Sequence, residues 1–217
     1  IRVKRFDNEF SFTTLDGTER KIDDKTLMIC NGDSPVAVAG IMGGLDSEIV
    51  EDTTSLTLES ATFDAASVRK SSSRLALRTD ASMRYEKSLD PELTVIAIER
   101  FIKLLSDYDE GVKVTSSLTD EYAYHYPEIS LDFNKDFVNR YTGIEIPNST
   151  IINTLTALGF KVENDKDDFK VTVPSWRATK DVTLKADIIE EITRIFGYDN
   201  FDVNTTLAPL YPIRAFT

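Results

Sequence analysis

The stretch Arg78-Thr79-Asp80-Ala81-Ser82-Met83-Arg84-Tyr85-Glu86-Lys87 sets small residues and hydroxyl groups among paired charges, a pattern that a hydrophobic core does not require. Two earlier stretches share this character, Gly40-Ile41-Met42-Gly43-Gly44 and Leu58-Glu59-Ser60-Ala61. Thr79 and Ser82 are residue types that cap helices, so a helix is expected to start here. Three glycines in five residues permit a tight turn, or a turn at which a ligand approaches the backbone closely.

Outward from these motifs, residues 1–60 predict short strands separated by turns, with Asp16-Gly17 as a hairpin signal. Strands are expected at residues 1–4, 26–30, 36–39, 58–61 and 112–114. The spacing of apolar residues then changes and predicts helices over 65–73 and 91–106, the second behind Asp90-Pro91.

A domain boundary is expected between residues 116 and 127, where the chain is polar and rich in tyrosine. Beyond it a second module is expected, with a strand at 129–133, helices at 135–141, 149–158 and 182–196, and a hairpin pairing 161–163 with 169–173. Asn148 or Ser149 is expected to cap the second of these helices. The predicted fold class is α+β, with a strand-rich domain and packed helices over 1–120, a small winged-helix-like domain over 127–200, and a tail or next segment from 201 to 217.

Composition describes an ordinary globular protein, with 41% hydrophobic and 29% charged residues in a chain of 217. Since no apolar run approaches the roughly 20 residues of a membrane span, a soluble protein is expected. The single cysteine, Cys30, predicts a buried thiol on a strand and fits a reducing, cytoplasmic compartment. Because the first residue is Ile1, the chain is expected to be part of something longer.

The formal net charge of −12 disfavours a surface that grips nucleic acid everywhere. The segment from Arg69 to Lys87 is nevertheless locally basic, with six basic residues and two acidic ones. It is either a solvated helix face or a local binding patch.

Glu59 is the candidate recognition residue, because a carboxylate between Leu58 and two small residues could accept a hydrogen bond from a substrate hydroxyl. The alternative is an exposed glutamate on a strand. No nucleophilic triad can be assembled, since the single histidine, His125, lies in the expected linker. A hydrolytic reaction would therefore use positioned water.

Asp187, Glu190 and Glu191 lie at positions i, i+3 and i+4 of the last predicted helix, with Asp181 at its expected beginning. Four gathered carboxylates repel one another unless a cation neutralises them, and oxygen ligands suit Mg²⁺. The alternative is that Asp181 stabilises the helix start and the others are solvated.

The motifs resemble the beta subunit of bacterial-type phenylalanyl-tRNA synthetases. The resemblance covers most of residues 1–200 in the family's order, and it rests on five runs of sequence: residues 35–44, 58–63, 77–87, 173–177 and 189–199. It implies a tRNA-editing domain that hydrolyses tyrosine wrongly esterified to phenylalanine tRNA, followed by the winged-helix-like module. A pocket shaped for an apolar side chain cannot strongly exclude an analogue that adds a hydroxyl, so a second site must select for that hydroxyl.

Carried over by motif, Glu59 would accept the phenol proton of tyrosine and the Gly43 backbone would line the same pocket. Ala81 would leave room for the ring, and Thr79 would act in catalysis by helping to place the ester and water. The resemblance also implies that four carboxylates bind Mg²⁺ shared with an alpha subunit: Asp181, Asp187, Glu190 and Glu191.

The implied partners are tRNA(Phe) and the alpha subunit, in a heterotetramer of two alpha and two beta subunits, with no DNA and no membrane. ATP would be used by the full enzyme and not by this part. The family's editing domain also carries a His-Ala-Phe-Asp motif upstream of the segment that resembles Ile1 to Arg5, so the isolated chain is expected to edit poorly. Two other classes stay open, a non-catalytic RNA- or protein-binding module and a structural spacer at a subunit interface.

Overall fold

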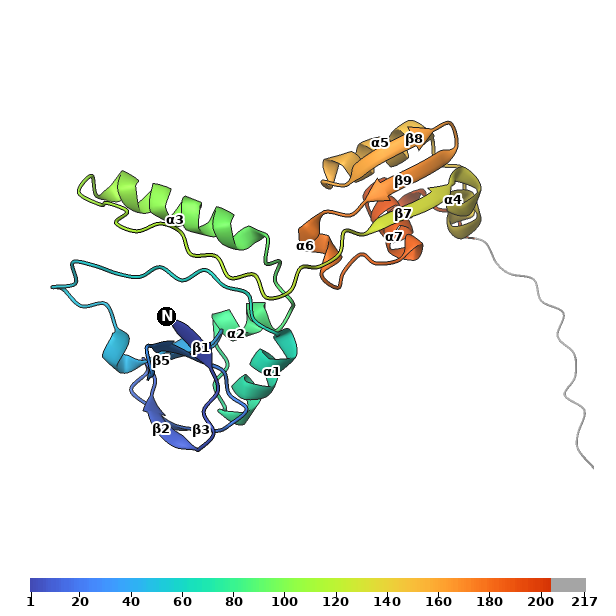
Figure 1. Ribbon diagram of the computed structural model, residues 1–217. Helices are drawn as coiled ribbons and strands as arrows, with labels where there is room; N and C mark the ends of the chain where they lie inside the picture. Colours follow the sequence, from blue (N-terminus) through green and yellow to red (C-terminus); the bar gives the residue numbers. More distant parts are fainter. Residues whose placement is uncertain (204–217) are drawn as a thin grey trace, which may run out of the picture. The chain divides into compact units, whose positions relative to one another are not determined.

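The computed structural model describes residues 1–203, which form two compact units of an α+β fold (Figure 1). The first unit comprises residues 1–127 together with Ser175–Asp181, and the second comprises Glu128–Pro174 and the chain from Val182 onward. The mixture of helices and antiparallel sheets confirms the predicted fold class. Most of the expected tail, residues 204–217, lies outside the described residues.

Six short strands form the sheets of the first unit. They are β1 (Arg2–Lys4), β2 (Phe10–Thr13), β3 (Glu19–Ile22), β4 (Met28–Asn31), β5 (Ser34–Val38) and β6 (Met42–Gly43). Strands β1, β4, β5 and β6 make one antiparallel sheet in that order, and β2 pairs with β3 as a hairpin. Gly17 lies in the hairpin turn at φ 74°, a conformation that glycine adopts without steric cost, which confirms the hairpin signal.

The helices of the first unit are the short 3₁₀ turn η1 (Leu45–Ser47), α1 (Ala65–Arg74), α2 (Asp80–Tyr85), α3 (Leu93–Tyr108) and α6 (Ser175–Ala178). Helices α1 and α3 lie close to their predicted positions, and α2 starts where its capping residues predicted, whereas η1 and α6 were not predicted. Asp64 caps α1, since its side chain accepts a hydrogen bond from the Ser67 amide.

Two strand predictions for this unit are wrong. Residues 112–114 form no strand, and the segment around Glu59 runs from 53 to 64 without helix or strand. A strand needs a partner ladder as well as suitable residues, and none of the described strands pairs with either segment.

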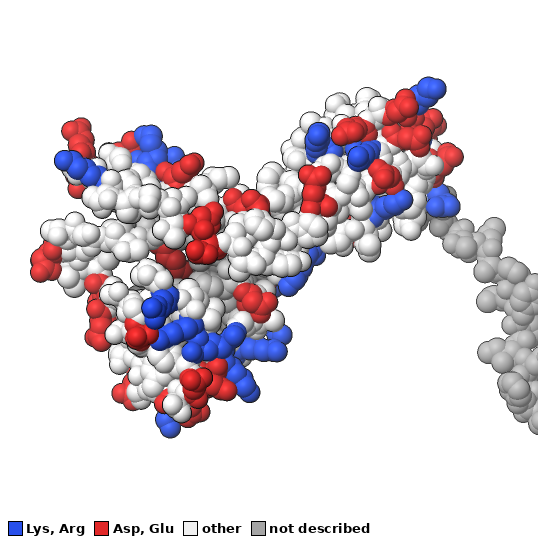
Figure 2. All heavy atoms as spheres, in the orientation of Figure 1, with Lys and Arg blue, Asp and Glu red and all other residues white. Residues whose placement is uncertain are grey.

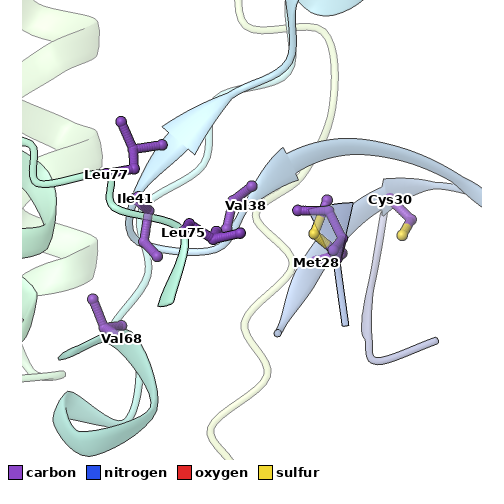
Figure 3. Close-up of a cluster of buried hydrophobic side chains, with 8 residues drawn as sticks. Met28, Cys30, Val38, Ile41, Val68, Leu75 and Leu77 are labelled. Atoms are coloured by element: carbon purple, nitrogen blue, oxygen red, sulfur yellow. The ribbon is translucent and has the colours of Figure 1, made fainter. Parts of the chain in front are cut away.

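The core of the first unit joins the sheet to α1 and to the chain that follows it (Figure 3). Its buried side chains are Ile22, Met28, Cys30, Val38, Ile41, Val68, Leu75 and Leu77. Ile41 comes from the turn between β5 and β6, so this turn is anchored in the core. Cys30 is a buried free thiol on β4, as predicted.

The second unit packs helices against a three-stranded sheet. Its elements are β7 (Ser130–Asn134), α4 (Lys135–Thr142), α5 (Asn148–Ala157), β8 (Lys161–Asp165), β9 (Asp168–Thr172), α7 (Lys185–Phe196) and the 3₁₀ turn η2 (Tyr198–Asn200). The antiparallel sheet has the order β7-β9-β8, and the predicted hairpin is confirmed as β8 and β9. The fully buried Ile151, Leu155, Val171, Ile188 and Ile192 fill its core.

One predicted helix start and one predicted helix cap in the second unit are wrong. Helix α7 begins at Lys185, three residues after the predicted start, because the Asp187 carboxylate accepts hydrogen bonds from the amides of Thr183 and Leu184 and fixes the start there. Helix α5 has Pro147 at its N-cap and no side-chain cap, since the Asn148 amide instead donates to the Lys166 carbonyl at 2.9 Å. Among residues 1–203, none of the helices combines the length and apolar character needed to cross a membrane.

Candidate functional site

The turn between β5 and β6 requires its glycines for close packing. Gly40 has φ 68°, and a Cβ atom added to it would lie 2.9 Å from the Phe63 ring and 3.1 Å from Val68. A Cβ on Gly44 would lie 2.5 Å from the Phe12 ring. All three distances are shorter than ordinary van der Waals contact, so these two positions have room only for glycine. The sequence-based alternative of a tight turn therefore has a direct structural basis.

Gly43 lies in β6, and its carbonyl oxygen accepts a 3.0 Å hydrogen bond from the Leu15 amide. A Cβ on Gly43 would lie 3.1 Å from Leu15. The residue is half-buried. Its backbone is thus held against the β2–β3 turn.

Thr79 is the N-cap of α2 and connects that helix to the glycine turn. Its hydroxyl oxygen accepts a 3.1 Å hydrogen bond from the Ser82 amide, and the same hydroxyl donates a 2.8 Å bond to the carbonyl oxygen of Ile41. In return the Ser82 hydroxyl accepts a 2.9 Å bond from the Thr79 amide. The hydroxyl proton of Thr79 is therefore committed to the fold, and half-buried Ala81 lies in the first turn of the same helix.

Glu59 lies on the irregular segment beyond η1, with its side chain at the surface and partly withdrawn from water, which raises the pKa of its carboxyl group. Ser60 fixes this segment to α3, since its hydroxyl donates a 2.8 Å bond to the Thr94 carbonyl. Burial raises the pKa of the Tyr85 phenol, and the negative charge of Glu59 raises it further. Glu59 and Tyr85 therefore lie close enough to interact electrostatically.

The sequence did not single out Tyr85, because its role here depends on packing between distant segments and not on a local pattern. Its ring packs against Phe63, with the ring centroids 5.2 Å apart, and against Gly40. Tyr85 ends α2 while Thr79 begins it. The glycine turn thus contacts both ends of α2, Thr79 through Ile41 and Tyr85 through Gly40, and Glu59 lies near Tyr85.

Two hollows lie elsewhere on the described residues. One, of about 420 Å³ in the first unit, is lined by Lys87, Ser88, Leu89, Asp90, Leu93, Trp176, Thr179, Lys180 and Asp181. The other, of about 810 Å³ in the second unit, is lined mainly by the ends of β7, β8 and β9 with α4. Gly43, Glu59, Thr79 and Ala81 line neither of them.

The smaller hollow lies beside a long-range connection that the sequence did not reveal. The buried Asp90 carboxylate accepts a 2.7 Å hydrogen bond from the Ser175 hydroxyl, 85 residues later. The Thr179 hydroxyl donates a 3.0 Å bond to the Ser88 carbonyl. These bonds attach residues 175–181 to the first unit.

The four carboxylates proposed for magnesium have different environments. Asp181 pairs with Arg177 in the first unit, whereas the other three belong to α7 in the second. Asp187 accepts two backbone hydrogen bonds at 2.8 Å, and buried Glu191 forms a 2.6 Å ion pair with Arg194. Glu190 is exposed.

Carboxylate oxygens suit Mg²⁺, but three of these four already have partners within the protein. Within residues 1–203, no group of three or more acidic, histidine or cysteine side chains is gathered as a metal site. The arrangement does not fit a preformed magnesium site, so no chemical step is assigned to a metal here.

His125 stacks on the Tyr122 ring with a centroid separation of 3.8 Å. The Tyr122 hydroxyl donates a 2.6 Å hydrogen bond to Glu92. Burial and this hydrogen bond raise the pKa of Tyr122 to about 12. His125 is thus part of an aromatic contact in the linker, away from α2 in the sequence.

Comparison with known families finds two separate matches along the chain. Residues 1–110 match the family model of the B3/4 domain, and residues 131–198 match that of the tRNA synthetase B5 domain. The phenylalanine–tRNA ligase beta subunit of Salinibacter ruber is 41% identical over 199 residues, and that of Clostridium tetani is 42% identical over 189 residues. These alignments cover 92% and 87% of this chain but only 24% of each relative, so the chain spans about a quarter of their length.

Proposed function

The chain belongs to the family of phenylalanine–tRNA ligase beta subunits, and from that premise we propose that its first unit hydrolyses tyrosine wrongly esterified to phenylalanine tRNA. The observation that carries this proposal is the arrangement around α2. One hydrogen bond from Thr79 attaches this helix to the glycine turn, and Glu59 lies near its other end. The small residues of the glycine turn and the Glu59 carboxylate thus lie close to the short, capped helix α2.

Glu59 supplies the selectivity in this proposal. A carboxylate that accepts the phenol proton of tyrosine is left without that partner by phenylalanine, which penalises the wrong ester. Burial raises the pKa of the Glu59 carboxyl group, and a more basic carboxylate is a stronger hydrogen-bond acceptor.

Hydrolysis then requires water to attack the ester carbonyl. The new bond joins the water oxygen to the carbonyl carbon, the bond to the ribose oxygen breaks, and the ribose oxygen takes a proton. Thr79 holds the start of α2 beside the Ile41 carbonyl, and in this proposal its hydroxyl oxygen helps to place the ester and the water.

The test uses the full-length subunit with Glu59→Gln. The ratio of kcat/KM for the tyrosyl ester to that for the phenylalanyl ester is expected to fall about 10- to 100-fold, as for loss of one hydrogen bond to a charged group. Glu51→Gln is the matched control, since Glu51 is an exposed acid earlier in the same irregular region. An unchanged ratio in the Glu59 variant would show that this carboxylate does not read the phenol.

The second unit is proposed to serve assembly with an alpha subunit, in an enzyme of two alpha and two beta subunits that uses ATP and Mg²⁺ elsewhere. The support is that the similar proteins are named as beta subunits. The mass of the complex formed with co-expressed alpha subunit tests this stoichiometry. A complex containing one copy of each subunit would contradict it.

A non-catalytic RNA-binding module remains the second candidate, because exposed basic residues gather on α1 and α2. Wild-type subunit that binds tRNA but hydrolyses neither ester would favour it over the editing function.

A further inference from the structure

Exposed basic side chains cover α1 and the neighbouring turns of the first unit. Figure 2 shows Lys and Arg gathered over the part of this unit where Figure 1 draws β1 and α1. We define the α1 basic face by five exposed residues that lie on α1 or on chain segments hydrogen-bonded to it: Arg5, Lys25, Arg69, Lys70 and Arg74. In a chain with a net charge of −12, such a gathering is a local feature.

Hydrogen bonds join three segments of the α1 basic face: the chain at Arg5, the turn at Lys25 and helix α1. Nη2 of Arg5 donates to the Ser67 hydroxyl on α1 at 3.4 Å, and Nε of Arg5 donates to the Lys25 carbonyl at 3.2 Å. Nη2 of Arg74 donates to the Thr26 hydroxyl at 3.1 Å. Positive charges from distant parts of the sequence are thereby fixed on one surface before any ligand binds.

Nearby acids are largely used within the fold. Asp23 lies 2.7 Å from Nε of Arg74 and also accepts a hydrogen bond from the Thr26 hydroxyl. Asp64 caps α1. Across residues 1–203, the side chains of Lys25, Arg69 and Lys70 form no ion pair, although exposed Asp24 is next to Lys25 in sequence. Two cations of α1 therefore face solvent without a neutralising partner.

Helix α1, which carries much of the α1 basic face, packs against α2, the helix of the candidate site. The Ser72 and Ser82 hydroxyl groups of these two helices lie 3.5 Å apart. Thr79 begins α2, whereas exposed Arg84 and Lys87 lie at its other end. A six-residue helix is only about 9 Å long, so Arg84 and Lys87 are separated from Thr79 by a distance that a few nucleotides of RNA can span.

We propose that the α1 basic face binds the phosphate backbone of the RNA whose esterified end enters the candidate site. This inference rests on the proposed function. Arginine and lysine bind phosphate oxygens through charge-assisted hydrogen bonds and release counterions from the RNA, so the binding is salt-dependent. An acidic protein surface is the alternative partner.

The first experiment is an acetylation footprint of the full-length subunit assembled with its alpha partner, with uncharged tRNA as the probe. Bound tRNA is expected to protect Lys70 while leaving Lys113, an exposed lysine of the same unit, reactive. Equal reactivity of Lys70 with and without tRNA would overturn the proposal. Stronger protection of Lys70 by polyglutamate than by tRNA would also overturn it, in favour of an acidic protein partner.

The second experiment compares two charge-neutralising double variants, Arg69→Ala with Lys70→Ala and Lys21→Ala with Lys113→Ala. All four residues are exposed, and none forms a salt bridge among the described residues, so both variants are expected to fold. The logarithm of the tRNA-binding constant falls as the logarithm of the salt concentration rises. The Arg69 and Lys70 double variant is expected to make this slope shallower by about 1.5, and the Lys21 and Lys113 double variant is expected to leave it unchanged. Equal slopes for both variants would overturn the proposal.

Because uncharged tRNA carries no ester, both experiments are independent of hydrolysis. Failure of the editing function would appear as unhydrolysed ester with the footprint intact. Failure of the α1 basic face would appear in the footprint and the salt slope.

Discussion

The hydroxyl group of Thr79 donates a 2.8 Å hydrogen bond to the carbonyl oxygen of Ile41, 38 residues earlier in the chain. Ile41 is buried in the core of the first unit, and Thr79 begins α2. One side chain therefore connects a core-anchored turn with a helix start. The motif that contains Thr79 therefore helps to hold the fold of the first unit together.

Thr79→Val is expected to lower the free energy of unfolding by about 1 to 2 kcal/mol, because valine keeps the shape of threonine but loses the cap and the bond to Ile41. Thr79→Ser keeps both bonds and is expected to stay within about 0.5 kcal/mol of wild type. Urea unfolding of the full-length subunit measures both. Equal stability of the valine variant and wild type would show that the bond contributes nothing.

Gly40→Ala is expected to destabilise the first unit more than Gly17→Ala does. Both glycines have positive φ, at 68° and 74°, so each alanine costs about 1 kcal/mol in backbone strain. Only at Gly40 does the added Cβ meet side chains, 2.9 Å from Phe63 and 3.1 Å from Val68, whereas at Gly17 nothing lies within 4 Å. Overpacking adds about 1 to 3 kcal/mol.

The difference between the two midpoints of thermal unfolding tests this prediction directly. Because Gly17→Ala reports the backbone cost alone, subtraction isolates the contribution of packing at Gly40. Equal midpoints would mean that Phe63 and Val68 move aside without cost.

Local signals predicted much of the fold because they depend on neighbouring residues. Asp16-Gly17 specifies its hairpin through turn geometry, and α1 matches the predicted helix within one residue. The same signals misplaced the start of α7, since Asp181 and Asp187 are both residues that cap helices. Only the structure shows that Asp187 makes the capping bonds.

Features that depend on distant contacts could not be predicted. The expected strand around Glu59 lacks a partner ladder, and the bond from Ser175 to Asp90 joins residues that no local pattern relates. For the candidate site, residue types suggested Glu59 and the family resemblance added Thr79, but the proximity of Tyr85 to Glu59 follows only from the folded chain.

Substitutions of Asp187 distinguish a helix-capping role of this residue from a magnesium-binding role. Its carboxylate accepts amide hydrogen bonds from Thr183 and Leu184, so Asp187→Ala is expected to cost about 1 kcal/mol of stability even in EDTA. Asp187→Asn keeps an oxygen acceptor and is expected to retain most of this stability.

Urea unfolding in EDTA and in excess Mg²⁺ measures the two contributions. A cap predicts the same loss in both solutions. If the alanine variant matched wild type in EDTA and fell below it only with Mg²⁺, the residue would act as a metal ligand and the capping role would be excluded.

Asp16 is expected to make the stability of the first unit sensitive to acid. A 2.6 Å hydrogen bond from the Thr14 hydroxyl, together with the Thr18 amide and Arg20, lowers the pKa of its carboxyl group to about 2. An aspartate in the unfolded chain has a pKa of about 3.9. Since the folded pKa is the lower one, the stabilisation is fully present above about pH 5 and is lost as the pH falls toward 2.

Asp16→Asn is therefore expected to lower the unfolding midpoint at pH 7, with the difference from wild type shrinking as the pH falls from 4 to about 2. Asp24→Asn is the matched control, because exposed Asp24 accepts no hydrogen bond from the described residues. Thermal unfolding at pH 7, 4 and 2.5 measures both variants. A difference that stays constant across this range would mean that the charge of Asp16 does not contribute, and that asparagine disturbs the turn through its shape alone.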